Sequence, residues 1–278
     1  MQRVTGYRAN KILYNFVKSN NLRGKFILPA NICPDVVDTL RYAGNSLCFV
    51  DIDAHTLCLD WRRVMTMAKE AVAVLAVHTY GIEDDFNEQF AALRAVNPNI
   101  AIIDDRCLCM PELNKPNSTG DLVLYSMCSK KQVDLGMGGI GYVSDGRNYE
   151  EIMVLENAVL TNETWVLDEK ILLSKMDAVI KHKEKLNAIY RKNLPAAIQL
   201  PTSYQHWRFN IIVQNKEEIL KAIFDAGLFA SGHYVPQADG CTIASNLYQH
   251  VINLFNDFYY TEEQARRTCE IINKLINV

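Results

Sequence analysis

The sequence has no long hydrophobic run and no block of charge of one sign. Its longest strongly apolar stretch covers residues 71–77, whereas a helix needs roughly 20 apolar residues to cross a bilayer. The formal net charge is -3, with 29 Lys and Arg spread among 32 Asp and Glu. Nucleic acids and anionic membranes select clustered basic residues, so we expect neither as a partner. A small-molecule ligand is the expectation that remains.

A signal peptide and paired cysteine motifs are also missing. Residues 1–5 carry no apolar segment of the kind that a signal peptide requires. None of the eight cysteines forms a Cys-x-x-Cys pair, and Cys48 lies within an apolar segment. The sequence therefore predicts a cytoplasmic protein with buried free thiols and without a metal site.

Short apolar runs and longer amphipathic runs alternate through the first half of the chain. Hydrophobic residues make up 49% of the sequence and charged residues 22%, as in ordinary globular proteins. Alternating elements with continuously apolar strands predict an α/β fold, in which helices flank both faces of a mostly parallel sheet. We expect strands at residues 26–28, 47–50, 71–77, 100–103, 122–125 and 140–143, and helices at about 9–19, 34–43, 61–68 and 88–96.

The pattern changes after about residue 150, where a long helix is expected at residues 167–190. A strand at 209–213 and helices at 217–226 and 262–275 follow. No low-complexity linker and no internal repeat interrupts the chain. We therefore expect a large cofactor-binding domain over residues 1–150 and a small α+β domain over residues 151–278.

Chemically reactive residues follow several of the expected strands. In parallel sheets, ligands bind at the carboxyl ends of the strands. Asp105 comes just after one strand, Ser126 and Lys131 come after the next, and a glycine cluster at 136–139 follows. Each feature alone has an ordinary explanation as a helix cap, a solvated charge or a tight turn. Their order and spacing favour a single site.

This combination resembles the fold-type I enzymes that use pyridoxal phosphate (PLP), and specifically the DegT/DnrJ/EryC1/StrS family of sugar aminotransferases. The family pattern has a serine, the Schiff-base lysine five residues later and a glycine motif after five more. Ser126, Lys131 and Gly136 match that register, which selects Lys131 over Lys130. Further segments that resemble family motifs cover residues 29–31, 49–53, 77–81, 120–126 and 254–264.

The resemblance implies a role for each matching residue. Lys131 would supply the amine that condenses with the cofactor aldehyde and would then act as acid and base. Asp105 would keep the pyridine nitrogen protonated, because a carboxylate stabilises that cation. The phosphate would be held by Ser126, Gly6 and Tyr7, the ring faced by Cys33 and His78, and the substrates contacted by Arg208, His233 and Tyr234.

Three of these assignments keep an ordinary alternative. Gly6 is also consistent with a flexible terminus, His78 with a structural residue that finishes a strand, and His233 with an exposed loop position.

The sequence also departs from the family pattern around the expected cofactor. Cys33 stands where relatives stack an aromatic ring, Leu108 replaces a histidine or glutamine, and Met137 replaces a glutamate. The Asn-Tyr-Arg segment, which in relatives reaches the phosphate of a neighbouring subunit, has no match between residues 153 and 165.

The resemblance implies a PLP-dependent aminotransferase that moves an amino group, with glutamate as the expected donor, to a nucleotide-linked keto sugar. Retention of Lys131 favours transamination, because relatives with a histidine there are sugar dehydratases. A homodimer is expected. Two alternatives stay open: a non-catalytic or partner-dependent relative with the same fold, and a different PLP reaction on an amino acid.

Overall fold

A seven-stranded sheet in the order β1-β7-β6-β5-β4-β2-β3 is the main element of the computed structural model, which describes residues 1–276. Strands β2 to β6 run parallel, and β7 is antiparallel to both of its neighbours. The predicted mostly parallel sheet is confirmed. The strands are β1 (Gln2–Gly6), β2 (Lys25–Pro29), β3 (Ser46–Val50), β4 (Ala73–Val77), β5 (Ala101–Asp105), β6 (Leu122–Ser126) and β7 (Gly139–Val143).

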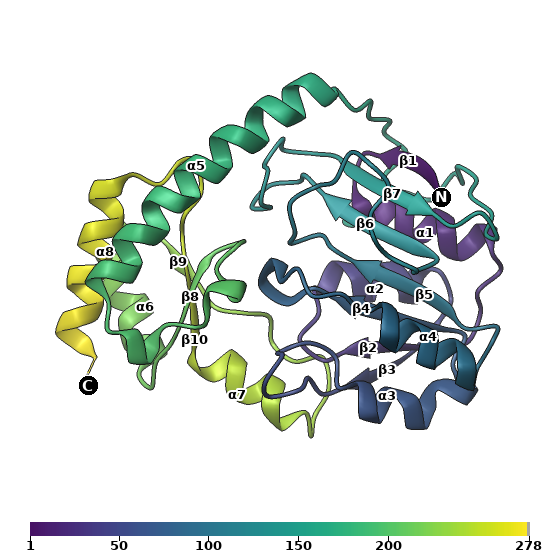
Figure 1. Cartoon of the computed structure of the whole chain (residues 1–278), viewed down its shortest axis with the longest axis horizontal. Helices are drawn as coiled ribbons and strands as arrows, with labels where there is room; N and C mark the ends of the chain where they lie inside the picture. Colours follow the sequence, from purple (N-terminus) through teal and green to yellow (C-terminus); the bar gives the residue numbers. More distant parts are fainter. Residues whose placement is uncertain (277–278) are drawn as a thin grey trace.

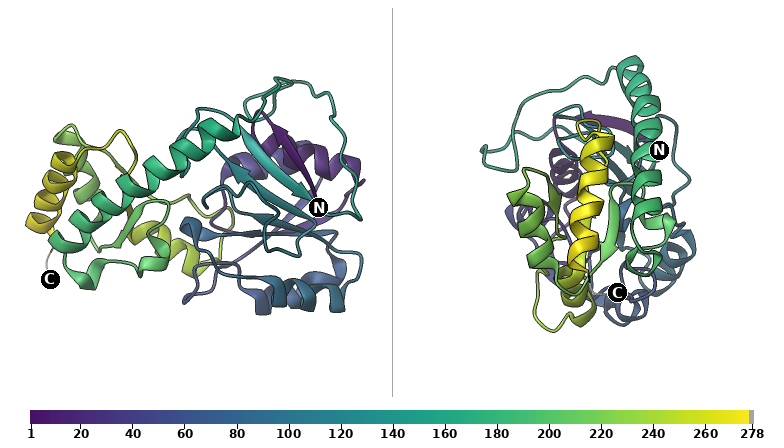
Figure 2. Two further views of the ribbon diagram at one scale, coloured as in Figure 1. Left: turned by 45° about the horizontal axis from the view of Figure 1, so that its top comes forward. Right: turned by 90° about the vertical axis from the view of Figure 1, so that its left-hand side faces the viewer.

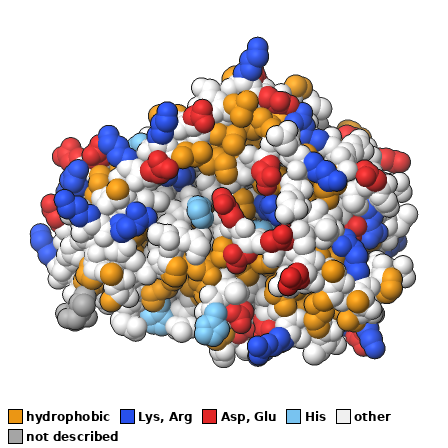
Figure 3. All heavy atoms as spheres, viewed as in Figure 1, with side chains coloured by type: hydrophobic (Ala, Val, Ile, Leu, Met, Phe, Trp, Pro, Cys, Tyr) orange, Lys and Arg blue, Asp and Glu red, His pale blue; other side chains and the backbone are white. Residues whose placement is uncertain are grey.

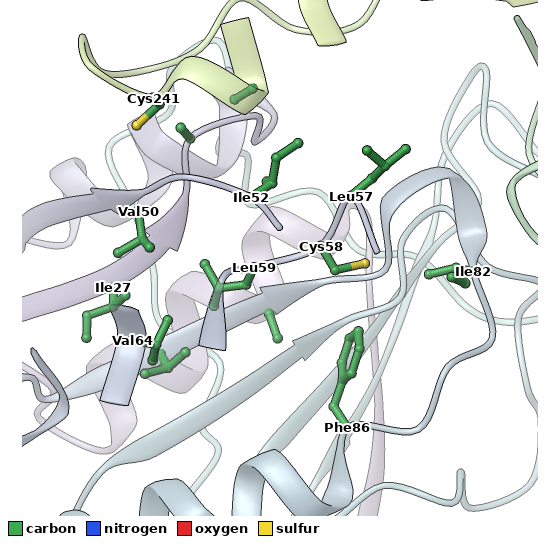
Figure 4. Close-up of a cluster of buried hydrophobic side chains, with 14 of the residues drawn as sticks. Ile27, Val50, Ile52, Leu57, Cys58, Leu59, Val64, Ile82, Phe86 and Cys241 are labelled. Carbon is green, nitrogen blue, oxygen red and sulfur yellow. The ribbon is translucent and has the colours of Figure 1, made fainter. Parts of the chain in front are cut away.

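Helices cover both faces of this sheet (Figure 1). Because alternate residues of a strand point to opposite faces, Phe26 and Leu28 pack in the cluster of α1 (Ala9–Ser19) and α2 (Pro34–Tyr42). Ile27, between them, packs in the cluster of α3 (Trp61–Met67) and α4 (Asn87–Val96), which Figure 4 shows. The continuously apolar strands of the sequence thus supply two cores at once.

A second sheet of three antiparallel strands lies beyond residue 200, in the order β8-β10-β9. Helices α5, α6 and α8 pack around it, and the long α5 connects the two sheets (Figures 1 and 2). The elements are α5 (Glu169–Asn193), β8 (Phe209–Ile212), α6 (Lys216–Asp225), β9 (Ala230–Ser231), α7 (Thr242–His250), β10 (Val251–Leu254) and α8 (Glu262–Leu275), with short 3-10 turns η1 (Ala68–Glu70), η2 (Thr79–Gly81), η3 (Ala196–Ile198) and η4 (Thr202–Tyr204).

The division expected near residue 150 stays a proposal. Val159 and Leu160 are buried in the cluster of α1 and α2, and this packing favours a later boundary, at the start of α5. We call the residues before α5 the large lobe and the described residues from α5 onward the small lobe. Asp51 joins the lobes, because its carboxylate accepts from the backbone N–H of Ile243 at 3.0 Å and of Ala244 at 2.9 Å, at the start of α7.

Besides the short 3-10 turns, the described residues form four elements that were not among those expected from the sequence: β1, β9, α7 and β10. All eight cysteines have free thiols, and four of them are buried. Within residues 1–276, no helix combines the length and the apolar character needed to span a membrane. Charged side chains of both signs are interspersed on the face shown in Figure 3.

Candidate active site

A cavity of about 480 Å³ lies between the lobes, at the carboxyl ends of β2, β4, β5 and β6. Seven of the predicted site residues line it. From the large lobe come Cys33, Asp105, Ser126 and Lys131, and from the small lobe come Arg208, His233 and Tyr234. The structure therefore brings together residues that are separated by up to two hundred positions in the chain.

Asp105 ends β5 and is only 6% exposed. Its Oδ1 accepts from the backbone N–H of Cys107 at 2.9 Å, which fixes the orientation of the carboxylate. Strand alternation sends the preceding Asp104 to the opposite face of the sheet, where it pairs with His78 and with Arg106. The two adjacent aspartates thus belong to different environments.

Lys131 lies in the loop after β6. Its neighbour Lys130 adopts a left-handed backbone with φ of 68°, and this conformation is held from both sides. The backbone N–H of Lys130 donates to Asp134 Oδ2 at 3.0 Å, and its carbonyl accepts from Trp207 Nε1 at 2.7 Å. The loop is therefore positioned by the small lobe as well as by its own side chains. Lys130 and Lys131 both line the cavity.

One end of the cavity is suited to an anion. Arg8, Ala9 and Asn10, at the start of α1, line it, and no side chain caps this helix. Backbone N–H groups at a helix start bind phosphate readily. Ser126, which lines the same cavity, is 4% exposed and accepts from the backbone N–H of Cys128 at 3.4 Å.

Gly6 and Tyr7, predicted to hold the phosphate, lie beside this end instead of lining it. Gly6 is the last residue of β1 and pairs with Gly139 of β7. The carbonyl of Tyr7 accepts from the backbone N–H of Gly138 at 2.7 Å. The start of α1, at Arg8, Ala9 and Asn10, follows Tyr7 directly and lines the cavity, so we place the expected phosphate contact there rather than at Gly6 and Tyr7, which do not line it. Arg8 directly follows Tyr7 in the sequence, so the sequence already pointed to this part of the chain.

His78 does not line the cavity that the described residues form. Its Nε2 lies 2.7 Å from Asp104 Oδ1, and its Nδ1 lies 2.8 Å from the carbonyl of Ile82. The side chain is 1% exposed, with its ring centroid 4.6 Å from that of Phe86. Both nitrogens are engaged on the face away from Asp105, so we assign His78 a structural role and withdraw it as a cofactor ligand.

Arg208 lies under the cavity and is almost completely buried, with 1% exposure. Its guanidinium donates to Asp257 and lies 4.3 Å from the centroid of the Phe255 ring, while burial lowers its pKa. Among the described residues, its Nε has no hydrogen-bond partner. The Nε–H of Arg208 is therefore an unpaired but buried donor, and the charge of the side chain is already paired.

His233 and Tyr234 close the cavity from the small lobe. His233 Nε2 lies 3.1 Å from the carbonyl of Asn31, and burial lowers the pKa of His233 to about 4. This imidazole is therefore neutral near pH 7. Burial, and next the neighbouring Cys33, raise the pKa of Tyr234 far above its ordinary value, so Tyr234 carries a hydroxyl that can donate.

The departures from the family pattern lie where the sequence register places them. Cys33 and Leu108 both line the cavity. Tyr149 packs against the cluster of α1 and α2, and its hydroxyl accepts from Asn15 Nδ2 at 3.2 Å. Lining residues not expected from the sequence include Asn31, Thr79, Cys107, Cys128 and Trp207.

A second cavity of about 450 Å³ adjoins the first, and Lys130, Lys131 and Phe255 line both. Its wall includes Phe258 and Tyr259, which are 59% and 80% exposed. A ligand that reaches Lys131 from the first cavity therefore has a further, aromatic-lined space beside it.

Comparisons with known proteins identify the family and the fold of this chain. Residues 6–171 match the model of the family described as the DegT/DnrJ/EryC1/StrS aminotransferase family. No curated protein sequence matches the chain.

Solved structures of similar fold cover nearly the whole chain. PseC of Helicobacter pylori, an aminotransferase involved in the biosynthesis of pseudoaminic acid, gives a TM-score of 0.77 at 14% identity, with 99% of this chain and 86% of that chain covered. A Streptococcus pneumoniae protein in its PLP form gives 0.77 at 13% identity, with coverages of 99% and 88%. DesI, in the presence of its TDP-sugar product, gives 0.78 at 17% identity, with coverages of 99% and 80%. At these identities the likeness establishes the fold, and the predicted fold class is confirmed.

Proposed function

We propose, from the premise that the chain belongs to the DegT/DnrJ/EryC1/StrS aminotransferase family, that it is a PLP-dependent aminotransferase that aminates a nucleotide-linked keto sugar. One observation carries the proposal. Lys131, Asp105 and the uncapped start of α1 line the same cavity. They provide a primary amine, a carboxylate and an anion-binding site, which are the three groups that one PLP molecule would need.

The polar groups of the cavity fit PLP in kind and in order. Ser126 ends β6 and Asp105 ends β5, the neighbouring strand. The phosphate would be held by Ser126 and the N–H groups at the start of α1, and the pyridine nitrogen would face Asp105. Among the described residues, the Asp105 carboxylate has one protein donor, from Cys107, which leaves acceptor capacity for a protonated ring.

Bound PLP supplies an aldehyde that condenses with amines and a conjugated ring that withdraws electrons. Lys131 Nζ would form the covalent link and, once displaced, would carry a proton to and from the substrate carbon. Asp105 would keep the ring nitrogen charged. The neutral His233 and the Tyr234 hydroxyl, both in the wall, would orient the substrate without adding charge.

The second cavity supports an acceptor larger than an amino acid. It meets the first at Lys131 and carries exposed aromatic side chains, which suit a flat base. The similar structure of DesI was determined in the presence of a TDP-sugar product, and we extend that substrate class to this chain. Glutamate is our proposed donor, with Arg208, which lines the first cavity, as a contact for its carboxylate.

We also propose that the protein is cytoplasmic and a homodimer. Apolar side chains that precede or begin α5, including Met153, Leu155 and Val166, are 79–87% exposed. Exposed apolar groups gathered in one segment are typical of a subunit interface.

A non-catalytic relative is the second candidate, favoured by Cys33 and Leu108 in the cavity wall. The test is the half-reaction. Glutamate added to the PLP-loaded protein should remove the visible band of the lysine-bound cofactor and yield the pyridoxamine form, and a nucleotide-linked keto sugar should restore the band. A band that persists against every amino donor tried would favour the non-catalytic candidate.

A further inference from the structure

Asn31 carries a buried carboxamide that nothing in the described protein satisfies. The residue lines the first cavity and is 4% exposed, and neither its Nδ2 nor its Oδ1 has a hydrogen-bond partner. Leaving such a group unpaired costs free energy, typically about 1–3 kcal/mol. Its backbone is nevertheless fixed: the carbonyl of Asn31 faces His233 at 3.1 Å, and the carbonyl of Ala30 accepts from the N–H of Gln237 at 2.8 Å. The backbone of Asn31 is thus held in place, whereas its amide has no protein partner among the described residues.

The order of the strands fixes where this amide lies relative to the cofactor groups. Along the edge of the sheet, β6 carries Ser126, β5 carries Asp105, β4 comes next, and Asn31 follows β2. The phosphate arm and the 3-hydroxyl of PLP extend from opposite sides of the line from the ring nitrogen to the aldehyde carbon. With the phosphate toward β6 and the nitrogen at Asp105, the 3-hydroxyl must point toward β4 and β2. Asn31 lies on that side.

Two other large-lobe residues on that side are poor partners for the 3-hydroxyl. Leu108, which follows Asp105 by three residues, lines the cavity with an apolar side chain. Thr79, which follows β4, already donates its hydroxyl to the carbonyl of Leu57 at 2.8 Å. An oxygen that is partly anionic would otherwise face an apolar wall, which is unfavourable.

We propose that Asn31 is a cofactor-binding residue whose Nδ2 donates a hydrogen bond to the 3-oxygen of PLP, in place of the polar group that Leu108 lacks. This inference rests on the proposed function. The bond would stabilise the 3-oxygen as an anion and would compete for it with the N–H of the imine that Lys131 forms. Asn31 would therefore lower the pKa of that imine and strengthen cofactor binding.

The test measures PLP affinity, the pH midpoint of the cofactor's visible band, and the thermal stability of the cofactor-free protein. For Asn31→Ala we expect PLP affinity to fall roughly 10- to 100-fold, the size of a hydrogen bond to a charged acceptor, and the pH midpoint to rise. Stability without cofactor should stay equal or increase, because an unpaired amide is removed. Asn31→Asp, which places an anion beside an anion, should bind PLP more weakly still.

Two controls separate cofactor contact from general damage. Asn45 is also buried with an unpaired Nδ2, but its Oδ1 accepts from Gly24 N–H at 3.1 Å and the residue lies outside the cavity. Asn45→Ala should leave PLP affinity and the pH midpoint unchanged. Adding Leu108→Gln to Asn31→Ala should recover part of the lost affinity, because it restores a donor.

The outcomes separate this proposal from the proposed function. If the wild type forms the visible band and Asn31→Ala matches it in affinity and pH midpoint, the Asn31 proposal is wrong and the cofactor site stands. If the wild type binds no PLP, the proposed function fails as well. A loss of affinity in Asn31→Ala without a change in pH midpoint would also overturn the contact with the 3-oxygen.

Discussion

At the scale of single residues, adjacent residues can have different roles because successive side chains of a strand point to opposite faces of the sheet. Asp105 faces the cavity, whereas Asp104 is fully buried on the other side of the sheet. The same alternation separates Val77, which lines the cavity, from His78, which does not. Reactive residues that follow strands therefore mark the end of the sheet where the site lies. Which of them reach the site depends on the face of the sheet to which each side chain points.

We expect Asp105→Asn to leave the fold intact and to impair catalysis. Asparagine retains an acceptor for the N–H of Cys107 but loses the negative charge that would hold a protonated ring. The half-reaction with glutamate should slow on the order of 10²-fold or more, as when one electrostatic partner of a reacting group is removed. Stopped-flow absorbance would measure it, and an unchanged rate would contradict the role of Asp105.

Asp104→Asn should reduce the stability of the fold and have little effect on cofactor binding. The buried Asp104 carboxylate pairs with His78 at 2.7 Å and with Arg106 at 2.9 Å, and breaking such a pair costs about 3–5 kcal/mol. Urea unfolding should show this loss, while PLP affinity of the folded fraction should change little.

The Asp104 effect should also depend on pH. Burial raises the pKa of Asp104, but His78, Arg106 and Ser118 together outweigh burial, so its net pKa is lowered. A carboxyl with a lower pKa in the folded chain adds stability above its unfolded pKa of about 3.9 and loses it as the pH falls through the folded value. The stability difference between wild type and Asp104→Asn should therefore be largest above about pH 4 and shrink below it. A difference that grows toward lower pH would contradict this pairing.

At the scale of elements, the start of α1 depends on a glycine in β7. A Cβ atom at Gly139 would lie 2.6 Å from the backbone nitrogen of Ala9, a contact that forces backbone to move. Gly139→Ala should destabilise the protein by about 1–3 kcal/mol and weaken PLP binding, because the displaced segment lines the phosphate end of the cavity. Gly146→Ala, with no atom within 4 Å of the added carbon, is the matched control. Equal PLP affinities for both variants would contradict the placement of the phosphate.

Helix α5 carries a buried lysine that joins the elements of the small lobe. Lys183 Nζ donates to the carbonyl of Trp207 at 2.6 Å and to Asn256 Oδ1 at 2.7 Å. Burial first, and then the charge of Arg208, lower its pKa to about 7, against about 10.4 when unfolded. The folded chain thus binds fewer protons between these values, so Lys183 makes stability rise with pH from about 7 to about 10.

Replacing Lys183 by methionine should remove this contribution. The unfolding free energy of the wild type, minus that of Lys183→Met, should increase between pH 7 and pH 9 in urea titrations. A difference that stays constant would mean that Lys183 titrates normally.

The sequence predicted the parallel strands and the helices between them because these elements are local and strongly apolar. It missed β1, whose Gln2, Arg3 and Thr5 are polar or charged and whose partner β7 lies more than a hundred residues away. It also missed β9, which is two residues long, and β10, which begins directly after α7. Partners distant in the chain create such strands, and a single sequence does not reveal them. The sequence did not suggest our proposed role for Asn31 for the same reason, because that role depends on the order of the strands in the sheet.

At the scale of the whole molecule, the site is assembled from both lobes. Lys131 and Asp105 come from the large lobe, while His233 and Arg208 close the cavity from the small lobe. The spacing from Ser126 to Gly136 in the sequence favoured Lys131 over Lys130. It did not indicate that Trp207 Nε1 of the small lobe would donate a hydrogen bond to the carbonyl of Lys130 at 2.7 Å. We expect changes in the packing of the lobes to alter cofactor binding.

The exposed apolar segment before α5 leads to a prediction about assembly. Leu155 and Val166 are 82% and 87% exposed, which is costly in water unless another surface covers them. Light scattering at micromolar concentration should give twice the chain mass. The double substitution Leu155→Asp and Val166→Asp should shift the mass toward the monomer, and a wild-type monomer would contradict the proposed homodimer.

The most direct test of the cofactor site is the location of covalently trapped PLP. The purified protein is loaded with PLP, reduced with borohydride and digested, and the modified peptide is identified by mass spectrometry, with Lys130→Ala and Lys131→Ala as paired variants. The structure and the family register predict a pyridoxyl group on Lys131, retained in Lys130→Ala and lost in Lys131→Ala. Modification of Lys130 in the wild type, or of no lysine in this loop, would contradict the account.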